Sequence, residues 1–280
     1  MLIVVSPAKA LDFESPLPTR RFTVPEMLDR TEELVGIMRQ NSPEDLSRMM
    51  AISPKLGELN FERFQDWTVP FTPRNARPAV LAFNGDTYQG LAAGRQFDAR
   101  DFTRAQKMLR ILSGLHGVLR PLDLIQPYRL EMGSKVRHGN GGDLYSFWGS
   151  TVTERLRADM ETSPGPRVLV NLASKEYFGV VKPEVLDAPV VSPVFLDAGG
   201  DSGDGGEGGD GGDGALKVVS FFAKRARGAM AGWIVRERIN SVRALRQFDL
   251  DGYRFDPDRS AAHQPVFTRP ARPHAQPDLT

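Results

Sequence analysis

Short runs of consecutive apolar residues alternate with polar turns along this chain. The chain opens with Leu2-Ile-Val-Val5 and then meets Ser6-Pro7. An apolar run of this kind between turn-forming residues is typical of a buried strand. The pattern predicts strands at residues 2–5, 79–83, 167–172, 190–195 and 216–222, with weaker ones near 253–255 and 266–268.

Other segments repeat apolar residues with the period of an α-helix. This spacing predicts helices at residues 25–40, 101–112, 150–161 and 226–240. Ser42-Pro-Glu-Asp45 carries a helix-start signal for a further short helix. Because the predicted strands and helices alternate irregularly, we expect an α/β (α+β) fold with a mixed β-sheet wrapped by helices.

A tight glycine turn follows the predicted helix at 101–112. Gly114-Leu115-His116-Gly117 stands in front of Arg120 and Arg129. Glycine has no Cβ and accepts positive φ, so such a turn can bring backbone N–H groups close to phosphate. The turn resembles the Gly-hydrophobic-Gly turn of a helix-hairpin-helix, although Gly117 comes one residue late and Pro121 interrupts the second helix. A purely structural glycine turn explains the same residues.

Composition excludes some kinds of chemistry. The 280 residues are 40% hydrophobic and 25% charged, as in ordinary globular proteins. The chain has no cysteine, which excludes disulfides, thiolate-bound Fe–S clusters and a thiol nucleophile. The apolar run at the N-terminus is too short for a signal peptide, and no later segment resembles a membrane span. We therefore expect a cytoplasmic protein that does not bind a membrane.

The formal net charge of +1 hides an uneven distribution. Residues 199–214 hold five acidic side chains and no basic one, which leaves 36 basic against 30 acidic side chains elsewhere. Residues 215–246 hold eight basic side chains and one acidic side chain, a local charge of +7. Such an excess suits a polyanionic partner, although a solvated basic face is the simpler alternative.

The acidic segment at 199–214 is also rich in glycine. It lies between two predicted strands and lacks the apolar position of the calcium-binding β-roll repeat. We therefore expect a flexible loop inserted into one domain at residues 1–269. The Pro-containing segment at 270–280 is expected to be a disordered tail.

Polar residues follow three of the predicted strands, and they include Ser6, Lys9, Asn84, Asp86, Tyr88, Asn171, Ser174, Glu176 and Tyr177. In sheets flanked by helices, ligands gather at the carboxyl ends of strands. Lys9, Asp86, Ser174 and Glu176 are therefore candidates to share one cleft. Ordinary turn chemistry is the alternative explanation for these residue types.

Basic residues stand at the beginning of the predicted helix at 226–240. Lys224, Arg225 and Arg227 follow a predicted strand directly. Cations at a helix start oppose the helix dipole unless an anion bridges them, and the free N–H groups there also favour anions. This placement favours phosphate binding over a purely solvated face.

Familiar catalytic and metal-binding motifs are absent from the sequence. It contains no Gly-x-x-x-x-Gly-Lys-Ser/Thr loop, no His-Glu-x-x-His and no Gly-x-Ser-x-Gly elbow. Its four histidines are scattered, so their spacing indicates no metal site. We expect neither a bound metal nor a cofactor.

Several blocks of the sequence closely resemble the YaaA family of bacterial peroxide-stress proteins. They run in register from Met1 to about Thr268, and the Gly/Asp insertion and the Pro-containing tail lie outside them. The blocks are Ser6 to Asp12, Leu81 to Tyr88, Leu112 to Met132, Asn171 to Phe178, Pro193 to Asp197 and Ser220 to Gly228.

This resemblance implies a cytoplasmic protein, induced by hydrogen peroxide, that lowers the available intracellular iron. It also implies an α/β fold of one domain with a positively charged cleft, a helix-hairpin-helix-like element and DNA binding. We expect the helix-hairpin-helix-like element at Leu109–Pro121. Candidates for the basic cleft, chosen from the matched blocks and from charge, are Lys9, Arg120, Arg129, Lys224, Arg225 and Arg227.

Our first hypothesis is a DNA-binding stress protein that contacts mainly the phosphate backbone, with weak sequence specificity. The predicted DNA- or phosphate-binding residues are Gly114, Leu115, Gly117, Arg120, Arg129, Lys224, Arg225 and Arg227. The second hypothesis is an enzyme acting on a nucleotide or nucleobase, with Lys9, Asp86, Ser174 and Glu176 as cleft residues. Direct iron sequestration is a third, which the dispersed histidines disfavour. The sequence identifies no protein partner.

Overall fold

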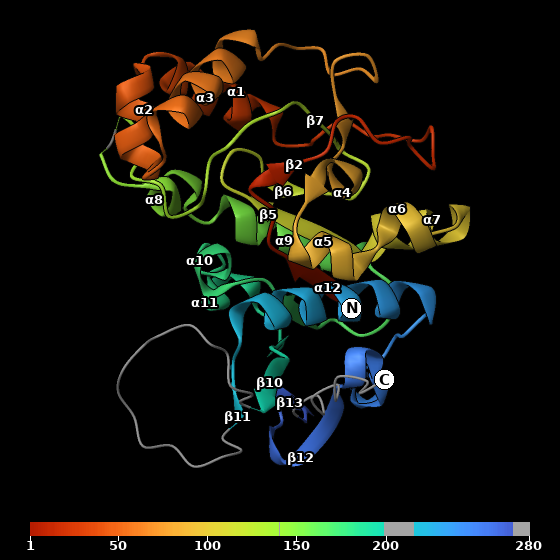
Figure 1. Ribbon diagram of the computed structural model, residues 1–280. Coiled ribbons are helices and arrows are strands. Elements are labelled where there is room, and N and C mark those ends of the chain that lie inside the picture. The colour runs from red at the N-terminus through yellow and green to blue at the C-terminus, as the bar shows by residue number, and fades with distance from the viewer. Residues whose placement is uncertain (140, 199–215, 271–280) are drawn as a thin grey trace, which may run out of the picture.

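The computed structural model describes residues 1–139, 141–198 and 216–270 (Figure 1). The predicted loop at 199–214 lies outside the described residues, as does the predicted tail beyond its first residue. Mixed β-sheets wrapped by helices confirm the expected fold class. Within the described ranges, no helix is both long and apolar enough to cross a membrane.

A five-stranded sheet occupies the centre, in the order β6-β5-β1-β8-β9. Its strands are β1 (Leu2–Val5), β5 (Leu109–Ser113), β6 (Gly117–Leu119), β8 (Leu169–Leu172) and β9 (Val190–Val191). β1 pairs in parallel with both β5 and β8, and β6 runs antiparallel to β5. All four residues of β1 are fully buried, as in a strand covered on both faces. The strands predicted at 2–5 and 167–172 are thereby confirmed.

A second sheet has four strands in the order β11-β10-β13-β12. They are β10 (Val194–Ala198), β11 (Leu216–Lys217), β12 (Arg254–Ala261) and β13 (Gln264–Arg269). Two small pairs complete the strands: β2 (Ala10–Leu11) with β4 (Phe83–Asn84), and β3 (Arg77–Pro78) with β7 (Leu124–Ile125). The weak strand signals near 253–255 and 266–268 therefore mark real strands.

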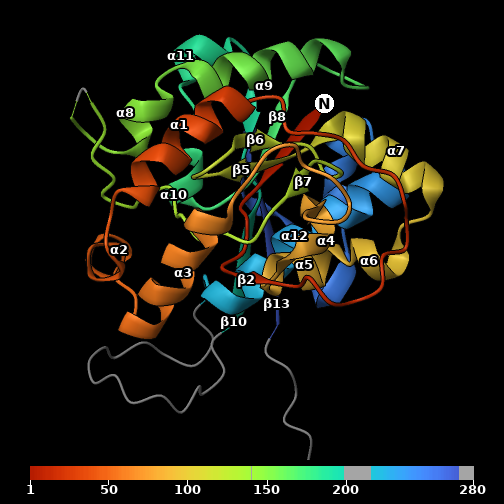
Figure 2. The same ribbon diagram turned by 90° about the horizontal axis from the view of Figure 1, so that it is seen from above.

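The long helix α12 (Ser220–Arg236) runs between the two sheets, as Figure 1 shows. Its residues from 228 to 235 are all buried, and all of them are apolar or small, as a helix covered on every side requires. Helix α5 (Asp86–Leu91) packs against it, and α7 (Ala99–Met108) contacts it as well. Figure 2 shows α1 (Leu28–Arg39) and α9 (Thr151–Thr162) on the other side of the central sheet.

The remaining helices are short or lie at the periphery. Ser42 and Asp45 form a capping box at the start of α2, which confirms the short helix predicted after Ser42. These remaining helices are α2 (Pro43–Met50), α3 (Pro54–Asp66), α4 (Ala79–Ala82), α6 (Ala93–Gln96), α8 (Leu144–Trp148), α10 (Lys175–Phe178) and α11 (Pro183–Leu186), with 3-10 turns η1 (Arg243–Gln247) and η2 (Leu250–Gly252).

Helices α5 and α12 touch through their backbones. A Cβ at Gly228 of α12 would lie 1.7 Å from the carbonyl oxygen of Thr87 in α5. A Cβ at Gly90 of α5 would lie 2.1 Å from the carbonyl oxygen of Arg225. Only glycine permits this approach, since real Cβ contacts are never so short. The contact fixes the position of Asp86 relative to Lys224 on the neighbouring helix.

Two predicted elements have the wrong secondary structure. Residues 79–82 of the apolar run at 79–83 form the short helix α4, because a short buried run fits a helix as well as a strand, and only Phe83 lies in a strand, β4. The helix predicted at 101–112 ends at Met108, and the chain continues as β5. Leu109 and Leu112 fit the helical spacing, but pairing with β1 and β6 determines their conformation.

Two other predicted strands change partway along. The run at 190–195 is divided between β9 in the central sheet and β10 in the second sheet. Pro193 lies between them and cannot donate a backbone hydrogen bond to a continuous strand. In the run at 216–222 only Leu216–Lys217 forms a strand, and α12 begins at Ser220.

The expected helix-hairpin-helix at Leu109–Pro121 is wrong, because this segment is a β-hairpin. β5 and β6 pair antiparallel, with Ser113 opposite Gly117. Gly117 has φ +66°, and a Cβ on it would meet the Trp148 ring at 2.9 Å. The Trp148 indole donates a hydrogen bond to the Gly114 carbonyl at 3.0 Å. The glycines therefore serve a left-handed turn and close packing.

Candidate functional site

A polar pocket of about 420 Å³ lies at the carboxyl ends of β1 and β8. We call it the carboxyl-end pocket, and its polar lining residues are Ser6, Lys9, Asn84, Asp86, Thr87, Glu131, Ser174, Glu176, Tyr177, Lys224 and Arg227. All four residues predicted to share a cleft are therefore present. They converge because the adjacent parallel strands β1 and β8 end at the same edge of the sheet.

The floor of the pocket is held together by hydrogen bonds between the two strand ends. The backbone N–H of Ser174 donates to Ser6 Oγ at 2.9 Å, and the two serine Oγ atoms lie 3.3 Å apart. The Tyr88 hydroxyl donates to the Ser6 carbonyl at 3.1 Å. Ser174 also accepts a hydrogen bond from the N–H of Tyr177, which caps α10. These bonds fix the loops that carry the charged side chains.

One wall of the pocket contains a small ion-pair network centred on Glu131. Its carboxylate lies 3.1 Å from Lys9 Nζ and 2.9 Å from an Arg129 guanidinium nitrogen. Beside it, the Glu176 carboxylate accepts the backbone N–H of Gly133 at 2.9 Å. Glu131 thus neutralises Lys9 from within the protein.

The opposite wall comes from α5 and α12. Asp86 lies in the first turn of α5, while Lys224 and Arg227 are one helical turn apart on α12. Neither Lys224 nor Arg227 forms an ion pair within the described residues. Burial lowers the pKa of Arg227 from its ordinary value. These two cations are free to meet an anionic ligand.

The formal charges of the lining balance. Lys9, Lys224 and Arg227 are matched by the three carboxylates of Asp86, Glu131 and Glu176. The pocket is therefore of mixed charge, in contrast to the basic cleft that we expected. A ligand that suits it carries an anionic group together with hydrogen-bond donors for the carboxylates.

Two tyrosines near the pocket stay protonated at any ordinary pH. Burial, followed by the charges of nearby groups such as Glu176 and Glu131, raises the pKa of Tyr177 far above its usual value. Burial likewise raises the pKa of Tyr88. Tyr88 uses its hydroxyl hydrogen on Ser6, whereas Tyr177 lines the pocket itself.

The sequence profile described as "Peroxide stress protein YaaA" matches residues 1–259 of this chain. The chain belongs to the YaaA family. A UPF0246 protein of Cellvibrio japonicus (strain Ueda107) is 48% identical over 269 residues, which cover 96% of this chain and 98% of that protein. The resemblance drawn from the sequence blocks is confirmed, and it connects the chain to the peroxide stress response.

Six of the eight residues predicted to bind DNA or phosphate in this YaaA family member do not line the carboxyl-end pocket. Gly114, Leu115 and Gly117 are buried within the hairpin, so their backbone is covered. Arg120 is held by Glu26 at 2.6 Å and by Asp123 at 2.8 Å. Only Lys224 and Arg227 of the eight predicted residues line the carboxyl-end pocket.

The two remaining arginines lie close to the pocket without lining it. Arg129 reaches it only through Glu131, and Arg225 lies 3.4 Å from Asp251. Glu131 itself was not among the predicted residues. No sequence signal placed it opposite Lys9, because the two residues meet only in the folded chain.

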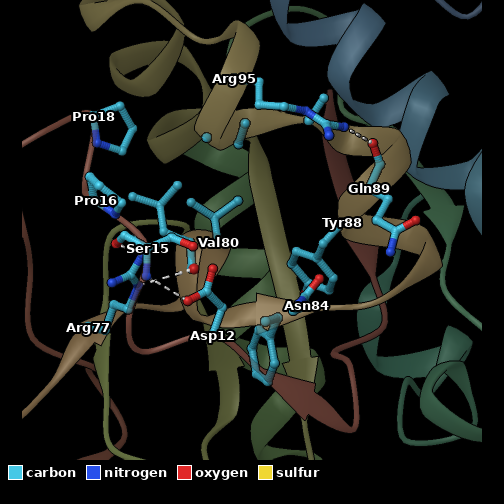
Figure 3. Close-up of a pocket in the computed structure, with 15 residues that line it drawn as sticks. Asp12, Ser15, Pro16, Pro18, Arg77, Val80, Asn84, Tyr88, Gln89 and Arg95 are labelled. Atoms are coloured by element: carbon cyan, nitrogen blue, oxygen red, sulfur yellow. Dashed lines mark hydrogen bonds between the residues drawn. The ribbon is translucent and has the colours of Figure 1, made fainter.

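A neighbouring pocket of about 280 Å³ shares Asn84 with the carboxyl-end pocket (Figure 3). Its Asp12 carboxylate accepts the backbone N–H of Ser15 at 2.9 Å, and hydrogen bonds with Ser15 lower the pKa of Asp12 to about 2. Arg77 donates to the carbonyl oxygens of Ser15 and Leu81. These charged groups bind other parts of the chain, so this pocket serves the fold.

Metal ligands do not gather in the described part of the chain. There, no three histidine, aspartate or glutamate side chains lie close enough together to hold a metal ion. The fully buried His116 is hydrogen-bonded through Nδ1 to Thr31 Oγ1 at 3.2 Å. Burial lowers its pKa to about 3, so this imidazole is neutral in the folded protein at neutral pH.

Proposed function

We propose that this YaaA family member acts in the peroxide stress response by binding DNA at the carboxyl-end pocket. Contacts to the phosphate backbone carry most of the affinity, with weak sequence specificity. In the cell, this binding limits free intracellular iron and DNA damage. The observation that supports the proposal is that Lys224 and Arg227, neither of which forms an ion pair within the described residues, line one pocket.

The chemistry of the pocket suits a nucleotide unit that is not base-paired. Lys224 and Arg227 are placed to contact phosphate oxygens, which favour charge-assisted hydrogen bonds. Asp86 and Glu176 can accept the amino or ring N–H groups of an exposed base. A volume of about 420 Å³ lies in the range of sites for small ligands. The mixed charge therefore favours single-stranded or distorted DNA over a regular duplex.

Neutralising one cation at a time tests this assignment. Lys224 and Arg225 are neighbours on α12, but only Lys224 lines the pocket. We expect Lys224→Gln to weaken binding of single-stranded DNA about tenfold and to reduce the salt slope by about one. The matched control Arg225→Gln removes the same charge and should change the affinity less than about threefold. Equal losses of DNA affinity in both variants would show that the general positive charge of this surface, and not the pocket, attracts DNA.

The effect on iron is tested in a bacterial strain that lacks its own family member. After hydrogen peroxide treatment, chelatable iron should be lower with the wild-type protein than with Lys224→Gln. If Lys224→Gln loses DNA binding but lowers iron as fully as the wild type does, DNA binding is not the route to iron limitation. Arg225→Gln should behave as the wild type in this assay.

The same pocket supports a second candidate, an enzyme acting on a nucleotide or nucleobase. The observation that favours it is the presence of Lys9, Asp86, Ser174 and Glu176 in one lining, where carboxylates and a lysine can move protons. Incubation with a panel of nucleotides and nucleobases, followed by mass spectrometry, should then reveal a product. Asp86→Asn should abolish the product, and a wild type without turnover would remove this candidate.

A further inference from the structure

Another pocket, of about 320 Å³, lies at the opposite end of the central sheet. It is lined by Arg100, Thr103, Arg104, Lys107, Pro164 and Arg238, and we call it the cationic pocket. The Pro164 carbonyl accepts a hydrogen bond from the Met1 nitrogen at 2.6 Å, which places the pocket beside the start of β1. Every charged side chain in its lining is a cation.

Three of the cations share one face of α7. Arg100, Arg104 and Lys107 follow the i, i+4, i+7 spacing that lines up side chains on a helix. Like charges at this spacing repel one another, which destabilises an isolated helix. None of them, nor Arg238, forms an ion pair with a carboxylate in the described ranges. Their repulsion is therefore not relieved by a direct ion pair.

The carboxylates that act on these cations are already engaged. Asp98 and Asp101 form the capping box at the start of α7, where each accepts backbone N–H groups. Asp98 Oδ1 accepts the N–H of Arg100 and that of Asp101, both at 2.7 Å. Even with these two acids counted, the four cations leave a surplus of two positive charges.

Arg104 presents a nitrogen without a partner. Its Nη2 donates to the Ile239 carbonyl at 3.1 Å, which connects α7 to the segment that follows α12. Its Nε is buried and has no hydrogen-bond partner in the described structure. Burial, and then the nearby charge of Arg238, lowers the pKa of Arg104. A buried N–H left without an acceptor is costly, so placing Arg104 at this position has a cost in stability.

Arg238 adopts a backbone conformation that glycine usually supplies. It follows the C-cap of α12 with φ +55°, a left-handed position commonly occupied by glycine at helix ends. Ile239 closes the helix by donating its N–H to the Ile234 carbonyl at 3.1 Å. An arginine at this position adds a cation to the pocket at the expense of some backbone strain.

We propose that the cationic pocket binds a phosphate-bearing ligand with at least two negative charges. Oxygens of such a ligand bridge the α7 cations and Arg238. The phosphate groups belong either to a free polyphosphate or nucleotide, or to the backbone of a nucleic acid. This site stands independently of the carboxyl-end pocket, because the two lie at opposite ends of β1.

Isothermal titration with inorganic tripolyphosphate tests the site in the full chain. We expect binding that weakens as salt rises, since the attraction is mainly electrostatic. Arg238→Gly removes a cation and supplies the residue that the left-handed conformation prefers, so affinity should fall about tenfold while thermal stability is kept. Lys107→Ala, at an exposed helix position, should have a similar effect.

The double variant Arg238→Gly, Lys107→Ala should bind tripolyphosphate roughly a hundredfold more weakly than the wild type. Lys55→Ala, which removes one exposed cation from α3, is the matched control and should bind normally. If the wild type does not bind, or if the control loses as much affinity as the pocket variants, the proposal is wrong.

Duplex DNA then identifies the source of the phosphate. If the pocket variants lose both tripolyphosphate and DNA binding, the ligand is a nucleic acid backbone; if DNA binding is unchanged, it is a free phosphate compound. Lys224→Gln should leave tripolyphosphate binding unaltered. Failure of the cationic pocket is thereby distinguished from failure of the DNA-binding proposal.

Discussion

At the carboxyl end of β1, three cations face three carboxylates in one pocket, whereas the pocket near its amino end is lined by four cations and, among the described residues, no acid. In the first, Glu131 already neutralises Lys9 at 3.1 Å. In the second, Arg104 Nε is left buried without a partner. The formal charges of the first lining balance, and those of the second do not.

This difference indicates two kinds of recognition. A pocket of balanced charge selects a ligand by the positions of its donors and acceptors, since no net attraction favours one sign. A pocket of surplus positive charge attracts any compact anion, and that attraction decreases as salt rises. We therefore expect the carboxyl-end pocket to distinguish an exposed base beside a phosphate from other anions, and the cationic pocket to bind compact anions by charge alone.

The largest expected effect is the destabilisation, at acid pH, of the fold that carries both pockets. The His116 pKa of about 3 in the folded protein lies below the ordinary value of about 6.5. The unfolded chain therefore binds more protons between these values, and the free energy of unfolding falls as the pH drops from about 6.5 to 3. Each pH unit contributes at most about 1.4 kcal/mol, so the loss reaches several kcal/mol.

Urea unfolding at a series of pH values measures this loss. His116→Gln cannot take up a proton, so its stability should decline less than that of the wild type over the same interval. Both pockets should then fail together in acid, which restricts their comparison to neutral pH. Parallel declines in wild type and variant would contradict the role of His116.

The next largest effect concerns the helix that both pockets share. Gly228→Ala places a Cβ 1.7 Å from the Thr87 carbonyl oxygen, so α5 and α12 must separate. We expect this overpacking to reduce the free energy of unfolding by about 3 kcal/mol. Tripolyphosphate and DNA binding should both decline, because Lys224 lies near the start of the disturbed helix and Arg238 directly follows its C-cap.

Gly36→Ala is the matched control for this substitution. No atom lies within 4 Å of a Cβ at Gly36, in the interior of α1. Alanine there should stabilise the protein by about 0.5 to 1 kcal/mol, because it loses less backbone entropy than glycine on folding. Equal destabilisation by both substitutions in a thermal melt would rule out the helix contact as the cause.

The smallest expected effect comes from giving the carboxyl-end pocket a surplus of positive charge, as the cationic pocket has. Glu131→Gln removes the carboxylate that holds Lys9 and Arg129, and so leaves a surplus of positive charge at the carboxyl end. DNA affinity there should rise about fivefold, equivalent to about 1 kcal/mol, and its salt dependence should steepen. Unchanged fluorescence-anisotropy titrations would show that Glu131 does not set the charge balance.

The predictability of the fold from the sequence depends on how many structures a segment can satisfy. The run at 2–5 contains the β-branched residues Ile3, Val4 and Val5 and ends in Ser6-Pro7, which favours a buried strand over a helix. Leu109 and Leu112 fit a helix by their spacing, and pairing with β1 and β6 makes them part of a strand. Such long-range pairing is not visible in local spacing.

The candidate site was predictable where it depends on parallel strands. Lys9 and Ser174 follow two strands that end at one edge, so their convergence with Asp86 and Glu176 was predicted correctly. The turn at 114–117 was misjudged, because glycines suit close packing against Trp148 as well as phosphate contact. The cationic pocket was not foreseen, since Arg238 joins the α7 cations only after folding.

The backbone contact at Gly228 has a mechanical consequence. Because no side chain lies between α5 and α12 at that point, the two helices have nothing to compress and cannot slide without collision. The two helices therefore form one rigid unit, and this unit sets the distance from Asp86 to Lys224. A bulkier ligand in the carboxyl-end pocket must therefore be accommodated on the other side, by the loop after β1 or by α10.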